Sequence, residues 1–444
     1  MLDEVAARLT EATARGLAAA VSRAIGEGAL TPGDRLPPIR TVAARLGLSP
    51  TTVSSAWQLL ARSGAIRTDG RRGTLVAQSR GNGPRRYRSA LRHHASFPLD
   101  LATGVPDPAL LPALGPALRR LPAIAPSSYL DEPVLPELEA RLRETWPWNA
   151  ERVTVLDGAM DAIDHLASSL LRLGDRVVVE NPSFPPLLDL LDTLGVEAVG
   201  VPLDAAGMIP SALHQALRSQ PVAIIVQPRA QNPTGAAWSA QRTRDLAAVL
   251  DEAPSVIVLE DDSAGDISSA SLHSLGALLP ERTIHIRSFS KSHGPDLRIA
   301  AVGGPAAILD PVLERRLVGQ AWTSRLLQHL LLNLLTDPAA VTQVARARRE
   351  YARRRRAVCA GLEQQGVRVD EGDGINLWLP VADEQAALIS LASVGIGAAG
   401  GSAFLTNDLG AHLRVTVGLV TSDHTGVAAA LAEAAHAGTR QIIR

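Results

Sequence analysis

The spacing of apolar residues predicts short helices near the start of the chain. Leu17, Val21 and Ile25 recur at intervals of four, which is typical of an amphipathic helix, and the glycine-containing stretch 26–28 ends it. A second short helix is expected after Pro38, and Gly47 allows a sharp turn behind it. Two short helices joined by a glycine turn are typical of a helix-turn-helix, and here the turn leads from the second helix into a third.

The third helix is expected to begin behind Ser49, an N-cap residue, with Pro50 at its first position, where the missing N–H costs nothing. The outer face of this helix carries short polar side chains: Thr51, Thr52, Ser54, Ser55 and Gln58. Stretches 65–68 and 74–77 then predict a β-hairpin, or wing, with a basic tip that contains Arg72. Residues 1–78 are therefore predicted to form a winged helix-turn-helix whose third helix reads the major groove of DNA.

From about residue 150 the pattern changes to short, continuous apolar runs with helical segments between most of them. The runs lie at 153–156, 176–180, 198–201, 223–226, 256–259, 283–286 and 299–302. Such runs predict a mostly parallel β-sheet that is buried on both faces by helices, which is an α/β fold. Ligands of these folds bind outside the carboxyl ends of the strands, so polar residues that directly follow the runs are the candidates for chemistry.

Charge divides the chain unevenly. The 444 residues carry a net charge of −1, but residues 1–97 hold 15 Arg and 6 Asp or Glu, so this stretch carries +9 and the rest −10. A basic N-terminal part suggests a nucleic-acid partner, although a small helical domain with a solvated arginine face is the alternative. Residues 79–97 are rich in Gly, Pro and charge and predict a flexible basic linker. Its adjacent His93 and His94 do not by themselves make a metal site, and no metal is expected.

Other counts narrow the classes of protein further. Cys359 is the only cysteine, so an internal disulfide is excluded. The longest uncharged apolar run, near 326–335, is too short to span a membrane, and the acidic start of the chain does not resemble a signal segment. We therefore expect a cytoplasmic protein without a membrane partner. Among 44 basic residues, Lys291 is the only lysine, and only lysine can supply a primary amine for a Schiff base.

The polar residues that follow the apolar runs match the parts of one cofactor, pyridoxal 5′-phosphate (PLP). Lys291 would bind the aldehyde, Asp261 the pyridinium nitrogen, and Asn232 the ring hydroxyl. Phe184 offers a stacking face, and Arg414 a bidentate fork for an amino-acid carboxylate. The phosphate would be held by backbone N–H groups, hydroxyls and a guanidinium, from Gly158, Ala159, Ser288, Ser290 and Arg298.

The N-terminal part also resembles the winged-helix domain of GntR-type bacterial regulators. The matching stretches are GDRLPPIR at 33–40, LGLSPTTV at 46–53 and GRRGT at 70–74. The resemblance implies contacts to DNA phosphates or bases from Arg35, Arg40, Thr52 and Arg72.

From about residue 98 to the end, the chain resembles fold-type-I aminotransferases. The matching stretches are SFSK at 288–291, PDLR at 295–298 and NPTG at 232–235. The resemblance implies a homodimer with the active site at the interface, a smaller C-terminal subdomain at about 337–444, and a contact from Tyr129 to the phosphate of the neighbouring subunit. Several positions depart from the family pattern. Ser263 replaces a usual Tyr, Asp157 a Ser or Thr, and Met160 a Gln, and Val134 and Glu139 stand in place of the usual small-residue and Arg signature near Tyr129.

The whole chain is similar to the MocR subfamily of GntR-type regulators, in which an aminotransferase-like domain serves as a ligand sensor, often in a head-to-tail dimer. The resemblance implies a transcriptional regulator that binds an operator in double-stranded DNA. It would sense an amino acid, an amine or PLP itself through aldimine chemistry at Lys291. The alternatives are an active aminotransferase with an added DNA-binding domain, and a DNA-binding protein that has lost PLP.

Overall fold

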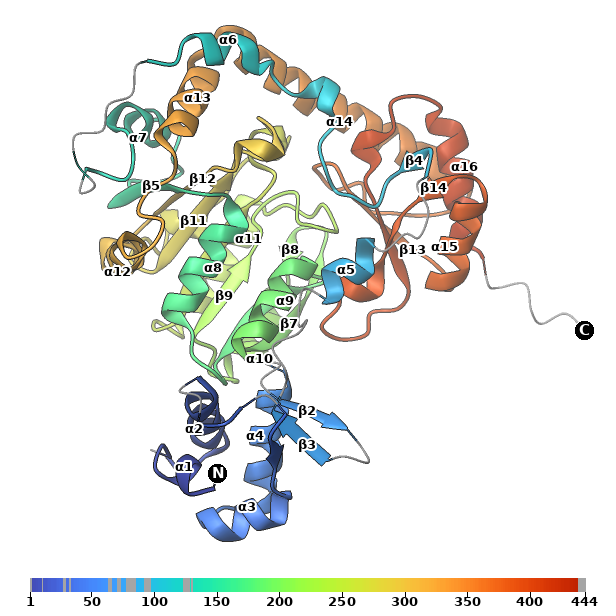
Figure 1. Cartoon of the computed structure of the whole chain (residues 1–444). Helices are drawn as coiled ribbons and strands as arrows, with labels where there is room; N and C mark the ends of the chain where they lie inside the picture. Colours follow the sequence, from blue (N-terminus) through green and yellow to red (C-terminus); the bar gives the residue numbers. More distant parts are fainter. Residues whose placement is uncertain are drawn as a thin grey trace, which may run out of the picture.

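The computed structural model describes residues 2–9, 11–26, 29–31, 33–62, 66–69, 73–76, 85–91, 97–122, 128 and 131–437 (Figure 1). We call residues up to 76 the head and residues from 97 onward the body. Within these described ranges, no helix is both long and apolar enough to cross a lipid bilayer.

The head forms one core from helices α1 to α4 and a small antiparallel sheet with the strand order β1-β3-β2. Its elements are α1 (Leu2–Ala6), α2 (Ala14–Gly26), β1 (Arg35–Leu36), α3 (Ile39–Leu46), α4 (Pro50–Arg62), β2 (Ile66–Asp69) and β3 (Gly73–Val76). Helix α3 ends at Gly47, whose φ of 68° lies in the left-handed region that favours glycine. Helix α4 begins behind Ser49, whose Oγ accepts a hydrogen bond of 3.0 Å from the Thr52 N–H. The predicted winged helix-turn-helix fold is confirmed.

The two faces of α4 are divided as the sequence pattern predicts. Its apolar residues Val53, Ala56, Trp57 and Leu60 are buried in the core of the head. On the other side, Thr51 is exposed and Thr52 and Ser54 are half-buried, while Arg35 on β1 and Arg40 on α3 are also exposed. Arg72, the predicted wing-tip contact, lies outside the described residues.

Within residues 79–97, predicted as a flexible basic linker, Arg85–Leu91 form helix α5. This helix packs on the body rather than extending into solvent: Ala90 is buried, and the Asp189 carboxylate of the body accepts hydrogen bonds from two α5 backbone N–H groups. The stretch has no apolar periodicity, so its helix depends on partners that lie about a hundred residues away in sequence.

The body is built on a mostly parallel sheet, which in the described part of the chain has eight strands in the order β5-β12-β11-β10-β9-β6-β7-β8. The strands are β5 (Arg152–Leu156), β6 (Arg176–Asn181), β7 (Glu197–Asp204), β8 (Gly207–Met208), β9 (Ala223–Val226), β10 (Ile257–Asp262), β11 (Thr283–Ser288) and β12 (Ala300–Gly304). Strand β12 runs antiparallel to both of its neighbours, and β8 runs antiparallel to β7. The predicted α/β sheet is therefore confirmed.

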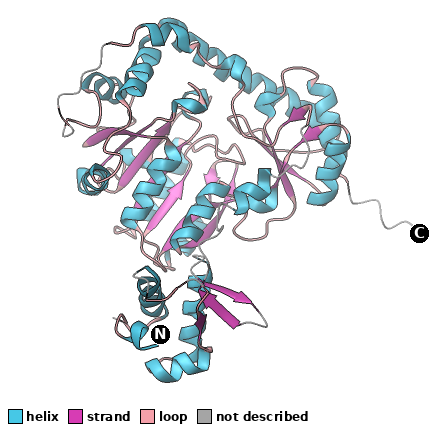
Figure 2. Cartoon of the chain, viewed as in Figure 1, coloured by secondary structure: helices cyan, strands magenta, loops and turns pink. Residues whose placement is uncertain are grey.

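Helices cover both faces of this sheet (Figure 2). Val177 and Val179 of β6 point into a core under α8 and α9, whereas Val178 between them points into a second core under α10 and α11. A third core on the large part of the body involves α7 and α13. The bounds are α6 (Leu114–Arg119), α7 (Pro136–Arg143), α8 (Ala159–Leu170), α9 (Pro185–Leu194), α10 (Pro210–Leu217), α11 (Ala240–Asp251), α12 (Ala306–Leu317) and α13 (Arg325–Thr336).

The C-terminal part of the body has its own core and small sheets, with α14 leading into it from the large sheet (Figure 1). Its elements are β4 (Leu99–Asp100), α14 (Pro338–Gln364), β13 (Leu377–Pro380), α15 (Glu384–Ser393), β14 (Ile396–Gly397), β15 (Ala399–Gly400), β16 (His412–Val415) and α16 (His424–Ala435). Short 3-10 helices connect the elements: η1 (Pro108–Leu110), η2 (Gly265–Ile267), η3 (Leu275–Ala277), η4 (Pro295–Leu297), η5 (Gly401–Phe404) and η6 (Val417–Leu419). Because β4 pairs with β14, residues before the large sheet join this C-terminal part.

Candidate functional site

Lys291 lies in the turn behind β11, at the edge of the sheet where the parallel strands end. Its side chain is partly buried and within electrostatic range of Asp261 on the neighbouring strand and of Arg414 on β16. Burial lowers the pKa of the lysine, the Asp261 charge opposes this, and the Arg414 charge adds to the lowering. A lysine with a lowered pKa holds more of its amine in the neutral, nucleophilic form.

Asp261 is buried near the end of β10, and one of its two carboxylate oxygens has no partner. Gln227 donates from Nε2 to Oδ2 at 2.6 Å, but Oδ1 has no hydrogen-bond partner among the described residues. Burial raises the pKa of Asp261 to about 6, against the lowering effect of the Gln227 hydrogen bond. An unpartnered, buried carboxylate oxygen fits a cationic N–H donor such as the protonated ring nitrogen of PLP.

The side chain of Gln227 forms hydrogen bonds with three residues of the site: the predicted Asp261 and Asn232, and Ser263, which replaces the Tyr usual in the family. It directly follows β9, and its Nε2 donates both to Asp261 and, at 3.1 Å, to Oγ of Ser263. Its Oε1 accepts a hydrogen bond of 2.7 Å from the backbone N–H of Asn232. Gln227 is not among the residues predicted for the site, although its place directly behind an apolar run is a signal in the sequence. The divergent Ser263 thus contacts this amide.

Asn232 is buried beside this amide, as its predicted role requires. Its Oδ1 accepts a hydrogen bond of 3.3 Å from Nδ2 of Asn376, which leaves its own Nδ2 group as a donor. Phe184 stands just before α9 and is partly buried. The edge of its ring meets the ring of Tyr87 from α5, with centroids 6.5 Å apart and planes at 72°. The sequence analysis did not predict this contact from the linker.

The start of α8, with Arg298 beside it, forms a cradle at the place where the sequence predicts a phosphate. Gly158 has a φ of 108°, and a Cβ at this position would lie only 3.2 Å from Nη2 of Arg298. Arg298 therefore lies against the glycine that precedes the first free N–H groups of α8. Ser288 and Ser290, the other predicted phosphate contacts, are joined by a hydrogen bond of 3.3 Å from the Ser290 N–H to Oγ of Ser288. Tyr129, predicted to complete this cradle from the neighbouring subunit, lies outside the described residues.

The Asp157 carboxylate beside this cradle is neutralised by an arginine. Nη2 of Arg316 on α12 donates to Oδ2 of Asp157 at 2.8 Å, and the Arg316 side chain is fully buried. The pairing explains how a carboxylate can stand where the family has Ser or Thr, because its charge is compensated. Arg316 is 159 residues away in sequence, so the sequence pattern gave no signal for the pair.

Arg414 is held in a fixed position on β16. Its Nη2 donates to the backbone oxygen of Ala102, its Cζ lies 5.3 Å from the centre of the Phe404 ring, and its Nε has no partner in the described structure. Burial lowers the pKa of Arg414 to about 10. A Cβ at Gly104 would lie 2.6 Å from Nη1, so glycine is required for this approach. A buried guanidinium with an unpartnered N–H suits a carboxylate ligand.

Two family models match this chain. One, described as bacterial regulatory proteins of the gntR family, matches residues 13–76, and the other, aminotransferase class I and II, matches residues 98–431. The chain belongs to the MocR subfamily of GntR-type regulators. The resemblance to MocR regulators found in the sequence is thereby confirmed. This MocR chain is a transcriptional regulator with an aminotransferase-like domain.

Named relatives agree with this assignment. The chain is 35% identical to the vitamin B6 salvage pathway transcriptional repressor PtsJ of Salmonella typhimurium, over 94% of this chain and 97% of the relative. It is 31% identical to the pyridoxine biosynthesis transcriptional regulator PdxR of Corynebacterium glutamicum, over 76% of each chain. Among solved structures, an aspartate aminotransferase of Thermus thermophilus with maleate matches with a TM-score of 0.67 and 22% identity, over 76% of this chain and 92% of that one. This likeness shows the fold of the body.

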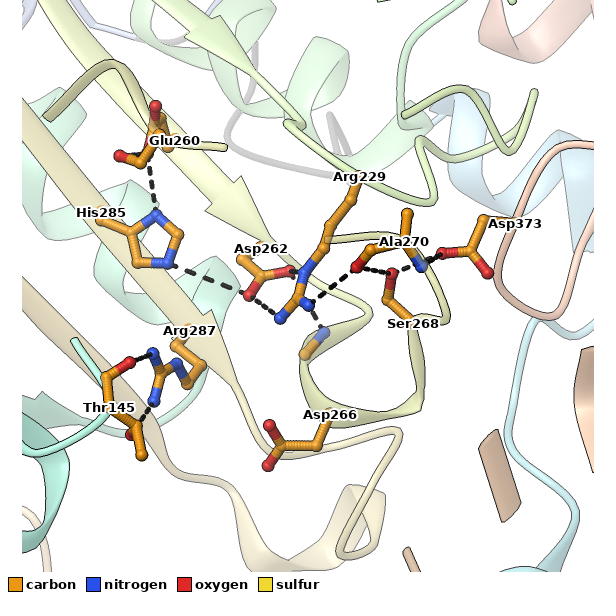
Figure 3. A network of polar contacts seen from close by, with 12 residues as sticks. Thr145, Arg229, Glu260, Asp262, Asp266, Ser268, Ala270, His285, Arg287 and Asp373 are labelled. Atoms are coloured by element: carbon orange, nitrogen blue, oxygen red, sulfur yellow. Dashed lines mark hydrogen bonds and ion pairs between the residues drawn. The ribbon is translucent and has the colours of Figure 1, made fainter. Parts of the chain in front are cut away.

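A buried network holds the strands that carry the site of this MocR chain (Figure 3). Asp262 forms a bidentate ion pair with Arg229, with distances of 2.9 and 2.7 Å, and Glu260 contacts Nδ1 of His285 at 2.9 Å. Side chains alternate along β10, so Glu260 and Asp262 share the face opposite to that of Asp261. Of the three consecutive carboxylates in the sequence, the middle one therefore faces Gln227 and Lys291, while the outer two join the network.

Proposed function

We propose that this MocR regulator binds PLP covalently at Lys291 and that occupancy of this site changes its affinity for DNA. One observation carries the proposal: the Lys291 amine is within electrostatic range of both Asp261, which has an unpartnered oxygen, and the buried Arg414 guanidinium. Lys291 and Asp261 lie at the carboxyl ends of the parallel strands, where α/β folds bind their ligands, and Arg414 faces them from β16 of the small C-terminal sheet.

When bound, PLP supplies an aldehyde that reacts with a primary amine and a ring that withdraws electrons. The protein contributes binding and orientation. Asp261 holds a proton at the ring nitrogen, Phe184 packs against the ring, and Asn232 donates to the ring hydroxyl. The phosphate is held by residues of the cradle: Gly158, Ala159, Ser288, Ser290, Arg298 and, from the neighbouring subunit, Tyr129.

PLP itself is the signal that we favour. Two relatives are named for vitamin B6 salvage and pyridoxine biosynthesis, and the first of them covers nearly the whole chain. An amino acid or amine that displaces Lys291 is the second candidate. For an amino acid, the unpartnered Nε of Arg414 offers a site for the carboxylate. Either ligand can shift the protein between two conformations only through its different affinities for them.

On the DNA side, we propose that two heads of a homodimer bind two half-sites of an operator, with α4 in the major groove. The proposed contacts come from exposed or half-buried residues of the head, together with Arg72 at the wing: Arg35, Arg40, Thr51, Thr52 and Ser54. Arginine contacts to phosphates make such binding weaker as salt rises.

The test is DNA binding measured by fluorescence anisotropy on fragments from upstream of the protein's own gene, with and without PLP. The wild type should change its affinity when PLP is added, and Lys291→Ala should not. An equal response of both proteins would contradict the role of Lys291. Incubation with amino acids and a keto acid addresses the alternative activity, because many turnovers per subunit would support an aminotransferase instead of a sensor.

A further inference from the structure

Helix α5 is fastened to the large part of the body at its first turn. Oδ1 and Oδ2 of Asp189 on α9 accept hydrogen bonds of 3.1 and 3.0 Å from the backbone N–H groups of Arg86 and Tyr87. The free N–H groups at a helix start need such an acceptor, and a carboxylate there also interacts favourably with the helix dipole. The cap comes from α9, the same helix that Phe184 precedes.

The same helix is also fastened to the C-terminal part of the body. Nη1 of Arg86 donates to the backbone oxygen of Leu405 at 2.8 Å. Ala90 is buried in a small apolar cluster together with Ala102 and Phe404. Helix α5 thus contacts both parts of the body between which the candidate site lies.

The residues that hold α5 are the residues that hold the site. Ala102 and Phe404, against which Ala90 packs, are the two residues that fix the Arg414 guanidinium. On the other side, Tyr87 lies with its ring at the edge of Phe184, which is the proposed stacking face for PLP. Tyr87 is also within electrostatic range of Arg414. Both walls of the site are therefore in direct contact with α5.

We propose that α5 is the element that couples the PLP site to the DNA-binding head, with Tyr87 forming part of the wall of that site. This inference rests on the proposed function and adds the path by which occupancy reaches the head. PLP against Phe184 fixes the ring on which Tyr87 packs, and this stabilises the docked position of α5. In the sequence, α5 lies between the wing of the head and the first strand of the body, so docking of α5 leaves fewer residues between the head and the nearest part held on the body.

A helix of seven residues is marginally stable in water, so α5 depends on its docking contacts. An element held by few contacts can be shifted by a small difference in ligand affinity between two states, which is what a sensor requires. Arg86 and Arg88 allow a matched comparison: both are on α5, but Arg86 binds Leu405 and lies 3.5 Å from Asp192, whereas Arg88 is exposed.

The experiment compares full-length wild type, Arg86→Ala and Arg88→Ala, each with and without PLP. Hydrogen exchange followed by mass spectrometry reports the docking of residues 85–91, and anisotropy reports DNA affinity. In the wild type and in Arg88→Ala, PLP should slow exchange in this peptide and change DNA affinity by the same factor. In Arg86→Ala, saturating PLP should still be captured, at a midpoint shifted to higher PLP concentration because PLP and α5 docking stabilise each other, and both effects should fall at least severalfold. Asp189→Ala should reproduce this loss from the other side of the contact.

The inference is overturned if PLP changes DNA affinity in the wild type while exchange in 85–91 stays the same and Arg86→Ala responds as fully as Arg88→Ala. That result would leave the proposed function intact. A wild type that captures no PLP would overturn the proposed function itself and, with it, this coupling. An equal loss of DNA affinity in both arginine variants, with unchanged response to PLP, would show that these arginines contact DNA and that α5 does not couple the two sites.

Discussion

Asp261 and Asp262 are adjacent in the chain, but Arg229 pairs with both oxygens of Asp262, whereas Oδ1 of Asp261 has no hydrogen-bond partner in the described structure. Both carboxylates are buried, so burial favours the protonated form of each. For Asp262, burial is opposed by the charge and the hydrogen bonds of Arg229 together with the nearby His285 and Arg287, which hold the pKa below its ordinary value, whereas the pKa of Asp261 is raised to about 6. One carboxylate thus serves stability and its neighbour remains available to a ligand.

This difference predicts that an Asp→Asn substitution affects mainly PLP affinity at position 261 and mainly the free energy of unfolding at position 262. Asp261→Asn should leave the free energy of unfolding of the PLP-free protein unchanged or slightly higher, because it removes a buried charge. It should weaken PLP binding about 10- to 100-fold, the value of a hydrogen bond between charged groups. Asp262→Asn should destabilise the fold by roughly 3–5 kcal/mol, because Arg229 is then left buried without its partner.

Urea unfolding and a PLP titration on both variants check this prediction. Equal losses of stability, or equal losses of PLP affinity, would contradict the division of roles between the two residues.

Glu180 predicts a pH dependence of stability. It is buried at β6, and burial raises its pKa from 4.5 to about 8, with the backbone N–H of Gln227 opposing this. Between pH 4.5 and 8 the folded state keeps a proton that the unfolded state loses, so stability should fall as pH rises, with a slope of up to about 1.4 kcal/mol per pH unit. Above pH 8 this contribution should be lost.

Glu180→Gln places a neutral amide at the same position, so it should remove most of this slope in the PLP-free protein. The Asp261→Asn variant is a useful comparison, since the contribution of Asp261 should end near pH 6. Unfolding measured at several pH values provides the check. A Glu180→Gln protein with the slope of the wild type would show that Glu180 is already ionised when folded.

Arg414→Gln separates the two candidate signals. If PLP alone is the signal, the variant should keep its DNA response to PLP, because no part of PLP that we assign binds Arg414. If an amino acid is the signal, the variant should bind it about 10- to 100-fold more weakly, since a charged hydrogen bond to its carboxylate is lost. The measurement is the midpoint of the spectral change on titration with amino acids, and an unchanged midpoint would contradict the assignment of Arg414.

Arg40→Ala should weaken DNA binding across all sequences and reduce the slope of log affinity against log salt by about one, as expected for one phosphate contact. Arg218→Ala, which removes an exposed arginine of the body, is the control. Anisotropy titrations at several salt concentrations measure both slopes. A slope for Arg40→Ala equal to that of the wild type would exclude the contact.

The sequence predicts the fold and much of the site because the relevant signals are local. Asp261 stands at the end of β10, Lys291 three residues behind the end of β11 and Asn232 six residues behind the end of β9, and parallel strands place these ends at one edge. The helices of the head are defined by residues within a few positions of each other, such as Ser49 and Thr52. These residues and helices can therefore be predicted from neighbouring positions in the sequence alone.

The parts that the sequence does not predict depend on pairs far apart in the chain. The Arg316 side chain neutralises Asp157 from 159 residues away. Helix α5 was expected to be flexible because its own residues carry no apolar pattern, and its cap, Asp189, lies about a hundred positions later. Such contacts exist only once the sheet has brought α9 and α12 into place.

The central claim is that PLP is bound covalently by Lys291. Borohydride reduction of the PLP-saturated protein, followed by peptide mass mapping, tests it most directly, because this is the only lysine side chain in the sequence. The account predicts a PLP adduct on the peptide that contains Lys291 and none on that peptide in Lys291→Ala. An unmodified Lys291 peptide from saturated wild-type protein would contradict the account.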